Sequence, residues 1–369
     1  MRKAVYRILA LNPGSTSTKL GVFDNEKCLI EAVIRHDKAY LSSLNMPNGS
    51  VLTQKAMRKE LIFKTLEEKN IVPETLDAVV GRAGRLPPMP SGTYLANDAM
   101  LKDVPDPLVH PALLGAIIAR EMGKQLNIPS YFVDPTVVDE ITPLARLTGI
   151  PEIKRSVIFH ALNHKAVARK CAKELRRAYK DCNFIVAHLG GGISIAAHEH
   201  GKAIDVTNAS NGEGPYSPER AGAMPALPLV DLCFSGKYTK AEIKTFFTKK
   251  GGLSAYTGSS DFKLLESNYS KGDAKAILLL EGMAYRIAKD IGAMYAVLSG
   301  NVDCIIITGG LAYSHRLIAL ITARVEKLAP VVIYPGEDEL LALAQGALRA
   351  LTGEEPAIVY RSKTENSQE

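Results

Sequence analysis

The feature that most constrains this chain is a strand–turn–strand unit that occurs twice in its sequence. In each copy an apolar strand runs into a glycine-containing turn, and two further strands follow. The strands are expected at residues 6–12, 18–24 and 28–34 in the first copy and at 184–188, 194–197 and 203–207 in the second. The two copies align at Ala10 with Ala187, at Gly14 with Gly191 and at Ser17 with Ser194. This repetition predicts a duplicated domain.

Helices and short apolar strands follow both copies, an alternation that is typical of α/β folds. The helices are expected at residues 51–69, 160–177, 240–250, 273–298 and 340–351, and the strands at 78–81, 131–134, 304–308 and 331–334. The sequence therefore predicts two α/β domains with mixed sheets flanked by helices, one at residues 1–150 and one at 151–337. A C-terminal helix at 338–353 is expected to pack back on the first domain. The polar segment 354–369 is expected to be a frayed tail.

Composition excludes several classes of protein. The net charge is +6, but the sequence lacks the cluster of interleaved basic and aromatic residues expected of a nucleic-acid-binding protein. No apolar run approaches the roughly 20 residues that a membrane span requires. The start of the chain lacks the features of a secretory signal, and the five scattered cysteines form no C-x-x-C pair. We therefore expect a cytoplasmic protein with reduced thiols and without a membrane or nucleic-acid partner.

Three glycine-bearing turns follow strands, at residues 12–19, 190–192 and 308–311. Glycine lets backbone N–H groups approach a phosphate closely, while hydroxyls and lysine add donors and charge. None is a Walker A loop, because the glycine directly before Lys19 is missing, and none is a G-x-G-x-x-G turn. A single turn of this kind is most often a plain hairpin. Three turns, two of them in equivalent places of a duplicated unit, favour phosphate binding.

The two units and the later glycine–glycine turn resemble the sugar kinase, actin and heat-shock ATPase superfamily. Segment 12–19 resembles the signature of the acetokinase family, and the agreement continues through 160–164, 188–192, 259–263 and 337–340. Segments 133–140 and 217–222 are similar to the butyrate kinase branch. The resemblance implies actin/ribonuclease-H-like domains with ATP in the interdomain cleft. It also implies reversible phosphorylation of a short-chain fatty acid carboxylate, and a homo-oligomer.

A carboxylic acid substrate sets particular requirements for catalysis. Its pKa is close to the ~4.3 of glutamic acid, so it is already anionic near pH 7 and needs no general base. The site must instead bring two anions together, which calls for cations, hydrogen-bond donors and a metal. By resemblance, Arg82 meets the carboxylate or the phosphoryl group, His160 donates to the phosphoryl oxygens, and Asp134 orients Mg²⁺. One arginine of the acetate kinases has no clear counterpart here, and Arg220, a few residues away, is the candidate to replace it. Arg85 is a weaker second candidate for the role given to Arg82.

The resemblance also assigns contacts to the nucleotide and the metal. Residues near the phosphates and the adenosine are Asn12, Ser15, Lys19, His188, Gly190, Gly191, Gly192, Asp261, Phe262, Lys263, Gly309, Gly310, Leu311 and Ala312. Magnesium is expected at Glu339, Asp134 and Asn12, with Glu337 as the competitor of Glu339.

Plainer interpretations stand beside these assignments. The alternative for Arg82 is a solvated loop arginine. Glu337 to Glu339 also suit the acidic N-terminus of a helix, an interpretation that is compatible with metal binding. His160 and His164 share a helix face and are typical of helix packing or, with a third ligand, of a zinc site. His198 and His200 are expected to be exposed in a turn. The alternatives for the whole chain are an acetate, propionate or branched-chain acid kinase, and a non-enzymatic actin-like ATP-binding switch.

Overall fold

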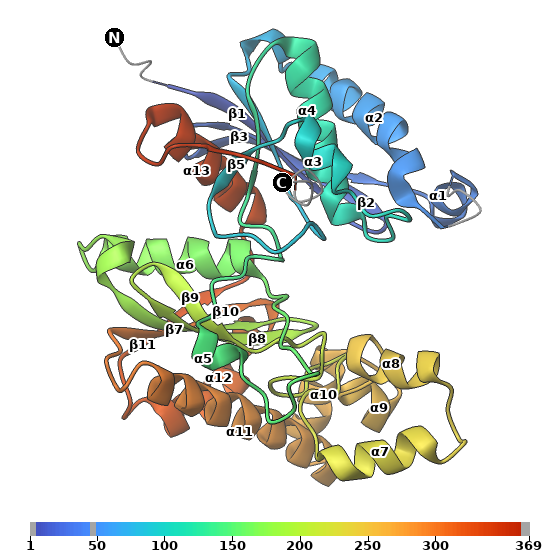
Figure 1. The fold of residues 1–369 in the computed structure, drawn as a ribbon, viewed down its shortest axis with the longest axis vertical. Coiled ribbons are helices and arrows are strands. Elements are labelled where there is room, and N and C mark those ends of the chain that lie inside the picture. The colour runs from blue at the N-terminus through green and yellow to red at the C-terminus, as the bar shows by residue number, and fades with distance from the viewer. Residues whose placement is uncertain (1–4, 45–48, 363–369) are drawn as a thin grey trace. The chain divides into compact units, whose positions relative to one another are not determined.

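The computed structural model describes residues 5–44 and 49–362, and its fold is shown in Figure 1. The chain divides into two compact units, Met1–Val138 with Asp338–Glu369, and Asp139–Glu337. Each unit is built around one mixed β-sheet with helices packed on it, as the sequence predicts. The start of the chain, residues 1–4, lies outside the described residues.

The first unit contains a seven-stranded sheet in the order β12-β5-β6-β4-β1-β2-β3. Its strands are β1 (Arg7–Pro13), β2 (Ser17–Asp24), β3 (Lys27–Arg35), β4 (Ala78–Gly81), β5 (Thr93–Leu95), β6 (Ser130–Val133) and β12 (Ile358–Val359). Its α-helices are α1 (Lys38–Leu44), α2 (Lys55–Glu68), α3 (Asp98–Lys102), α4 (Leu114–Leu126) and α13 (Glu339–Thr352), and its 3-10 turns are η1 (Val51–Gln54), η2 (Pro73–Thr75) and η3 (Pro111–Leu113).

The second unit contains a five-stranded sheet in the order β11-β10-β7-β8-β9. Its strands are β7 (Asn183–Leu189), β8 (Ile193–Glu199), β9 (Lys202–Val206), β10 (Cys304–Gly309) and β11 (Val331–Pro335). Its α-helices are α5 (Pro143–Arg146), α6 (Ala161–Glu174), α7 (Ala226–Phe234), α8 (Lys240–Thr248), α9 (Leu253–Thr257), α10 (Phe262–Ser270), α11 (Ala274–Val297) and α12 (His315–Val325), and its 3-10 turns are η4 (Tyr179–Asp181) and η5 (Gly310–Tyr313).

The two sheets share one strand order, which confirms the predicted duplication. The order β6-β4-β1-β2-β3 of the first unit repeats as β11-β10-β7-β8-β9, with the same parallel and antiparallel pairings. The hairpin turns differ in length, because residues 14–17 lie between the last paired residues of the first hairpin, Pro13 and Thr18, and residues 190–192 lie between those of the second. The register consequently aligns Asn12 with His188, each one pair before the turn. The sequence matches of Ala10 with Ala187 and of Ser17 with Ser194 are therefore both out of register.

Helices cover both faces of each sheet, because alternate residues of a strand point to opposite sides. In the second unit, Ile185 and Ile305 pack in one apolar cluster with α11 and α12, while Phe184 and Ile306 pack in another with α6. The strands accordingly lie between α6 and α11 in Figure 1. In the first unit, α2 and α4 contribute to one cluster, and α13 packs against β1, β2, β4 and β6.

The boundary between the units falls at Val138, before the predicted end of the first domain at residue 150. Residues 139–150 belong with the second unit because their polar groups bond there. Glu140 Oε2 accepts hydrogen bonds from Lys165 Nζ at 2.6 Å and from the Ala203 N–H at 2.9 Å. The sequence pattern gave no sign of these long-range contacts.

The predicted frayed tail does not hold for residues 358–362. Strand β12 pairs in parallel with β5 at the edge of the sheet, and Tyr360 is buried against Tyr94 and Phe132. The Tyr360 hydroxyl donates to Asp103 Oδ2 at 2.6 Å. The rest of the predicted tail, residues 363–369, lies outside the described residues.

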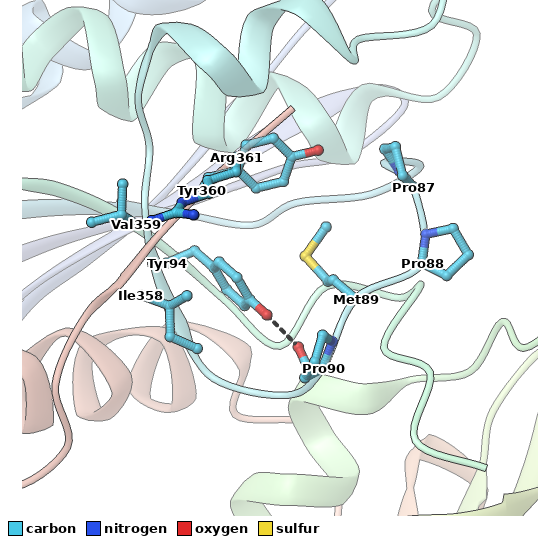
Figure 2. Close-up of a pocket in the computed structure, with 9 residues that line it drawn as sticks. All are labelled: Pro87, Pro88, Met89, Pro90, Tyr94, Ile358, Val359, Tyr360 and Arg361. Atoms are coloured by element: carbon cyan, nitrogen blue, oxygen red, sulfur yellow. Dashed lines mark hydrogen bonds between the residues drawn. The ribbon is translucent and has the colours of Figure 1, made fainter. Parts of the chain in front are cut away.

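Strand β12 also borders a pocket of about 640 Å³ (Figure 2). The Tyr94 hydroxyl, in this pocket, donates to the Pro90 carbonyl at 2.8 Å. The pocket is lined by Pro87, Pro88, Met89, Pro90, Tyr94, Ile358, Val359, Tyr360 and Arg361. None of these is a predicted site residue, so the candidate site must be sought elsewhere.

Among the described residues, no helix combines the length and the apolar character that crossing a membrane requires. The five cysteines are free thiols.

Candidate active site

Three predicted site residues of the first unit meet at one end of its sheet. Asn12 lies near the end of β1, Arg82 directly follows β4, and Glu339 is the first residue of α13. Since β1 and β4 are parallel, their carboxyl ends lie at the same edge, where ligands of α/β sheets bind. One Glu339 oxygen accepts a hydrogen bond from the Asn12 side-chain amide, and the other pairs with the Arg82 guanidinium. Glu339 therefore joins the residues predicted for the substrate and the metal.

The backbone at Arg82 is fixed on both sides. Its N–H donates to the Leu11 carbonyl at 2.8 Å, and its carbonyl accepts from the Ala116 N–H at 3.0 Å. A Cβ on the preceding Gly81 would overlap the Gly115 carbonyl, so β4 approaches α4 closely only because both positions lack side chains. Arg82 is thus half-buried and oriented by the fold, unlike a solvated loop arginine.

Asp134 follows β6 and has a left-handed backbone conformation with φ of 39°. Its Oδ1 accepts hydrogen bonds from the Ser91 hydroxyl and the Gly92 N–H, both at 2.8 Å. The carboxylate is buried and fixes the loop that precedes β5. A structural role for Asp134 is therefore visible, and its predicted role towards Mg²⁺ remains a prediction.

The turn at residues 14–17 presents polar groups outward. Ser15 and Lys19 are exposed, and the Gly14 N–H closes the turn by donating to the Ser17 carbonyl at 2.7 Å. Lys19 is paired with Asn12 across the hairpin, so the two side chains lie on the same face of the sheet. The buried guanidinium of Arg58, which sequence analysis missed, donates hydrogen bonds to the Gly14 and Ser17 carbonyls of this turn.

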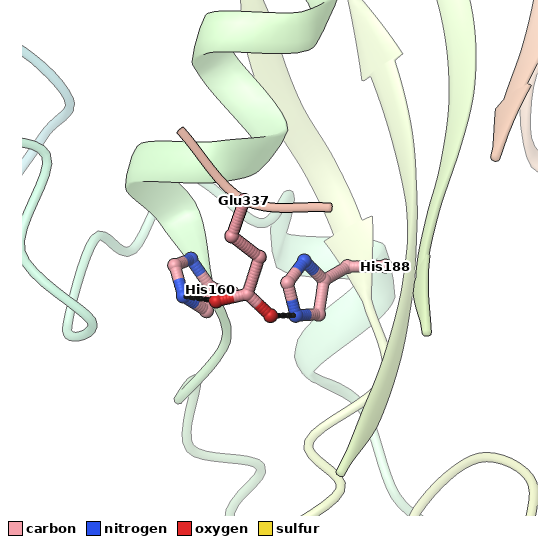
Figure 3. Close-up of side chains that lie close together, drawn as sticks. All are labelled: His160, His188 and Glu337. Carbon is pink, nitrogen blue, oxygen red and sulfur yellow. Dashed lines mark ion pairs between the residues drawn. The ribbon is translucent and has the colours of Figure 1, made fainter. Parts of the chain in front are cut away.

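In the second unit, two imidazoles converge on one carboxylate (Figure 3). His160 Nε2 lies 3.3 Å from Glu337 Oε2, and His188 Nε2 lies 3.1 Å from Glu337 Oε1. The two rings are stacked with centroids 4.4 Å apart. Burial alone would raise the pKa of Glu337, but hydrogen bonds and charge from both histidines hold it well below its usual range. Glu337 is therefore anionic at neutral pH.

Local structure positions both rings. His160 is the N-cap of α6, where its Nδ1 accepts from the Asn163 N–H at 3.4 Å. The Asn163 side chain bonds His188 Nδ1 at 2.8 Å, so one residue orients both imidazoles. Asn163 was not predicted, although it lies between the two histidines of segment 160–164 and could have been suspected from that position.

The structure offers a different set of zinc ligands from the pair His160 and His164 considered in the sequence analysis. The ligand atoms of His160, His188 and Glu337 lie within 4.8 Å of one another, and two imidazoles with a carboxylate are a set that zinc accepts. His164, predicted as the partner of His160 in such a site, is instead fully buried and bonds the Ser194 hydroxyl at 3.0 Å.

The turn at residues 190–192 lies beside this cluster. The Ser217 hydroxyl donates to the Gly191 carbonyl at 2.6 Å, and a Cβ on Gly192 would overlap the Arg220 guanidinium. Burial lowers the pKa of Arg220, while the charge of Glu219 raises it. The Arg220 guanidinium therefore lies against the backbone turn that is predicted to hold phosphates.

The residues predicted near the adenosine lie in two other places of the second unit. Asp261 is the N-cap of α10, and Phe262 contributes its ring to the core rather than to the surface. Lys263 and Gly310 are exposed, and Leu311 and Ala312 follow in η5. Gly309 has a φ of 92° and packs against the Leu189 backbone, so only glycine fits there.

One expectation about histidine is wrong. His198 lies within β8 and is fully buried, because its ring bonds the Tyr179 hydroxyl at 2.6 Å and packs on His164. His200 is exposed as predicted.

Comparisons with known proteins agree with this architecture. A sequence model described as the acetokinase family matches residues 151–331. The chain is 48% identical over 359 residues to a probable butyrate kinase of Clostridium botulinum, a match that covers 96% of this chain and 99% of that one. It is also 48% identical over 358 residues to butyrate kinase 2 of Clostridium acetobutylicum, with the same coverage.

Solved structures share the fold. An acetate kinase from Porphyromonas gingivalis superposes with a TM-score of 0.77 at 22% identity, covering 94% of this chain and 100% of that one. A propionate kinase from Francisella tularensis gives 0.71 at 20% identity, covering 92% and 98%. The resemblance noted in the sequence is confirmed, and the chain belongs to the acetokinase family.

Proposed function

We propose that this protein is a butyrate kinase, which reversibly transfers the terminal phosphoryl group of ATP to the carboxylate of butyrate. The observation that carries the proposal is the convergence of His160 and His188 on an anionic carboxylate, beside a glycine turn backed by Arg220. The identity of 48% to proteins named butyrate kinases supports the choice of butyrate.

The chemistry requires stabilisation of charge rather than removal of a proton. The substrate carboxylate is already ionised near pH 7, so the barrier comes from bringing it to an anionic phosphoryl group. Arg82 is oriented by backbone hydrogen bonds and by Glu339. Its planar fork suits either a carboxylate or a phosphoryl group. We assign Arg82 to hold the acid against the phosphoryl group.

The imidazoles supply donors for the transferring group. Both Nε2 atoms point to one carboxylate, whose oxygens carry the same kind of charge as phosphoryl oxygens. In the proposal His160 and His188 donate to those oxygens, and the N–H groups of residues 190–192 hold the β- and γ-phosphates. Asp261 to Lys263 and Gly309 to Ala312 would contact the adenosine, with Phe262 doing so only through its backbone because its ring lies in the core.

The residues present fit magnesium. Mg²⁺ prefers carboxylate and amide oxygens and retains several waters. Glu339 offers carboxylate oxygens, and Asn12, whose amide N–H donates to Glu339, offers its Oδ1. We propose that these two residues hold the ion, with Asp134 as a further contact. When bound, the ion would neutralise charge on the phosphate oxygens.

The test is acyl phosphate formation, trapped as the hydroxamate, with acids of two to six carbons. Butyrate is expected to give the highest kcat/KM, while a maximum at acetate, propionate or a branched acid would move the proposal to that substrate. His160→Ala is expected to lower kcat by about 10²- to 10³-fold. His200→Ala, an exposed histidine, is the matched control. ATP binding without any acyl phosphate would instead indicate an actin-like switch and overturn the proposal.

The proposal includes a cytoplasmic homo-oligomer. Free thiols suit a reducing compartment, and α7 exposes Leu227 and Phe234, which a second copy would cover. Light scattering measures the mass in solution, and a monomer would contradict this part.

A further inference from the structure

Arg58 is an arginine with no accessible surface, in a position that the proposed chemistry does not use. It lies in the first turn of α2, and its side chain is the bulkiest fully buried one among the described residues. Buried arginines are rare unless they are paired, so its surroundings require an explanation.

The guanidinium makes five hydrogen bonds, which match its five N–H donors. Nη1 donates to the Ser17 carbonyl at 3.0 Å and to the Thr18 hydroxyl at 2.8 Å. Nη2 donates to the Gly14 carbonyl at 3.0 Å. The remaining two bonds, from Nε at 3.1 Å and Nη2 at 2.8 Å, go to Gln54 Oε1. The guanidinium thus holds three oxygen atoms of the hairpin on its buried side, while Ser15 lies on the exposed side of the same turn.

These acceptors are all neutral oxygens. Burial lowers the pKa of Arg58 to about 10, which leaves the side chain charged at neutral pH. The charge also acts on a neighbour, because burial and then the Arg58 charge lower the pKa of His36 to about 4. His36 Nε2 lies 2.9 Å from the Thr18 hydroxyl. Arg58 is therefore a buried cation that its hydrogen-bond acceptors do not neutralise.

The bonds also set the direction of the turn's amides. In a trans peptide the carbonyl and the following N–H point in opposite directions. Because the Gly14 carbonyl faces Arg58, the Ser15 N–H points away from it, towards the exposed side of the turn. An outward N–H above a fixed positive charge is a favourable arrangement for an anion.

We propose that Arg58 is a positioning residue for phosphate binding, which aims the N–H of the 14–17 turn at the phosphoryl group and adds positive potential beneath it. This inference rests on the proposed function, in which that turn contacts the transferred phosphate. A residue that only supported the fold would contribute to stability and leave nucleotide affinity unchanged.

The decisive variant is Arg58→Lys, which keeps a charge but loses the fork. We expect ATP affinity, measured by calorimetry, and kcat/KM for ATP to fall about 10-fold, by analogy with the 10- to 100-fold losses seen when residues that orient metal ligands are replaced. Arg58→Met also removes the charge, so its ATP affinity is expected to fall further. Lys59→Met is the control, because Lys59 lies on the same helix and pairs with Glu121 at 3.1 Å, away from the turn.

The outcomes separate this inference from the proposed function. A folded Arg58→Lys protein with the ATP affinity of the wild type would overturn the inference even if Arg58→Met failed to fold. An equal loss in Lys59→Met would overturn it too, because a general charge effect would then explain the result. A wild-type protein that binds ATP but forms no acyl phosphate would defeat the proposed function alone, since the affinity comparison would still test Arg58.

Discussion

Acidification from pH 7.5 to 5.5 should destabilise the protein through two histidines buried in the second unit. His164 and His198 are both fully buried, and His164 Nδ1 lies 3.4 Å from His198 Nε2. Burial, reinforced for His164 by the neighbouring histidines and for both by Lys165, lowers their pKa values well below 6.5. The folded state therefore keeps both rings neutral across this range, while the unfolded chain takes up protons.

The sign and the size follow from proton linkage. Stability rises with pH wherever the unfolded state binds more protons, so it is lost as pH falls below the unfolded pKa of about 6.5. For one group, RT ln(1 + 10^(6.5−pH)) grows by about 1.4 kcal/mol between pH 7.5 and 5.5. The two histidines together then account for about 2.7 kcal/mol of the loss.

Urea denaturation followed by circular dichroism at both pH values measures the loss. His198→Gln retains an amide that can bond Tyr179 and should reduce the pH-dependent loss by about 1.4 kcal/mol, whatever its effect at pH 7.5. His200→Gln, which changes an exposed ring, should leave the loss unchanged. If His198→Gln lost as much stability on acidification as the wild type, the neutral buried state of His198 would be refuted.

Three further substitutions test the packing that supports the site. Gly81→Ala should destabilise the protein by about 3 kcal/mol or more, because its Cβ would overlap the Gly115 carbonyl; an unchanged thermal midpoint would show that α4 can move aside. Lys165→Met removes the buried cation that pairs with half-buried Glu140 at 2.6 Å and should cost about 3–5 kcal/mol in urea denaturation, part of which Glu140→Gln should restore. Truncation after residue 353 removes β12 and buried Tyr360, so the unfolding midpoint should fall by the equivalent of about 3–5 kcal/mol, and a midpoint equal to that of the full chain would contradict the packing of this segment.

The duplicated hairpins could be predicted because their signals are local. Apolar runs, glycine-bearing turns and helical periodicity mark β1, β2, β7 and β8 without knowledge of distant contacts. Helices α6, α8, α11 and α13 likewise form where predicted, with ends shifted by a few residues. Local signals therefore predicted the fold class.

Features that depend on distant partners could not be predicted. Strand β12 consists of only Ile358 and Val359, and it exists because β5 offers an edge to pair with. His198 was placed at the surface because it was assigned to a turn, yet it lies in β8, where Tyr179 and His164 bury it. In each case the residue alone is compatible with both environments, and the partner decides between them.

The choice between Glu337 and Glu339 shows the same limit at the candidate site. Sequence analysis treated the two as competitors for one role, whereas the structure gives each its own partners. Glu337 follows β11 and Gly336, whose φ of 87° turns the chain, and it binds two histidines. Glu339 opens α13 and binds Asn12 and Arg82.

Asp338 separates these roles. It is the N-cap of α13, where its Oδ1 accepts from the Leu341 N–H at 3.2 Å, so the backbone changes from extended to helical between the two glutamates. The donors in each unit come from duplicated hairpins and the elements beside them, but both carboxylates come from a single segment, at the second of the two points where the chain passes between the units. Asn12 and His188 occupy equivalent positions in the two hairpins, so the two clusters differ chemically through the side chains around these positions. The placement of Glu337 and Glu339 on either side of the N-cap Asp338 determines which cluster each carboxylate joins.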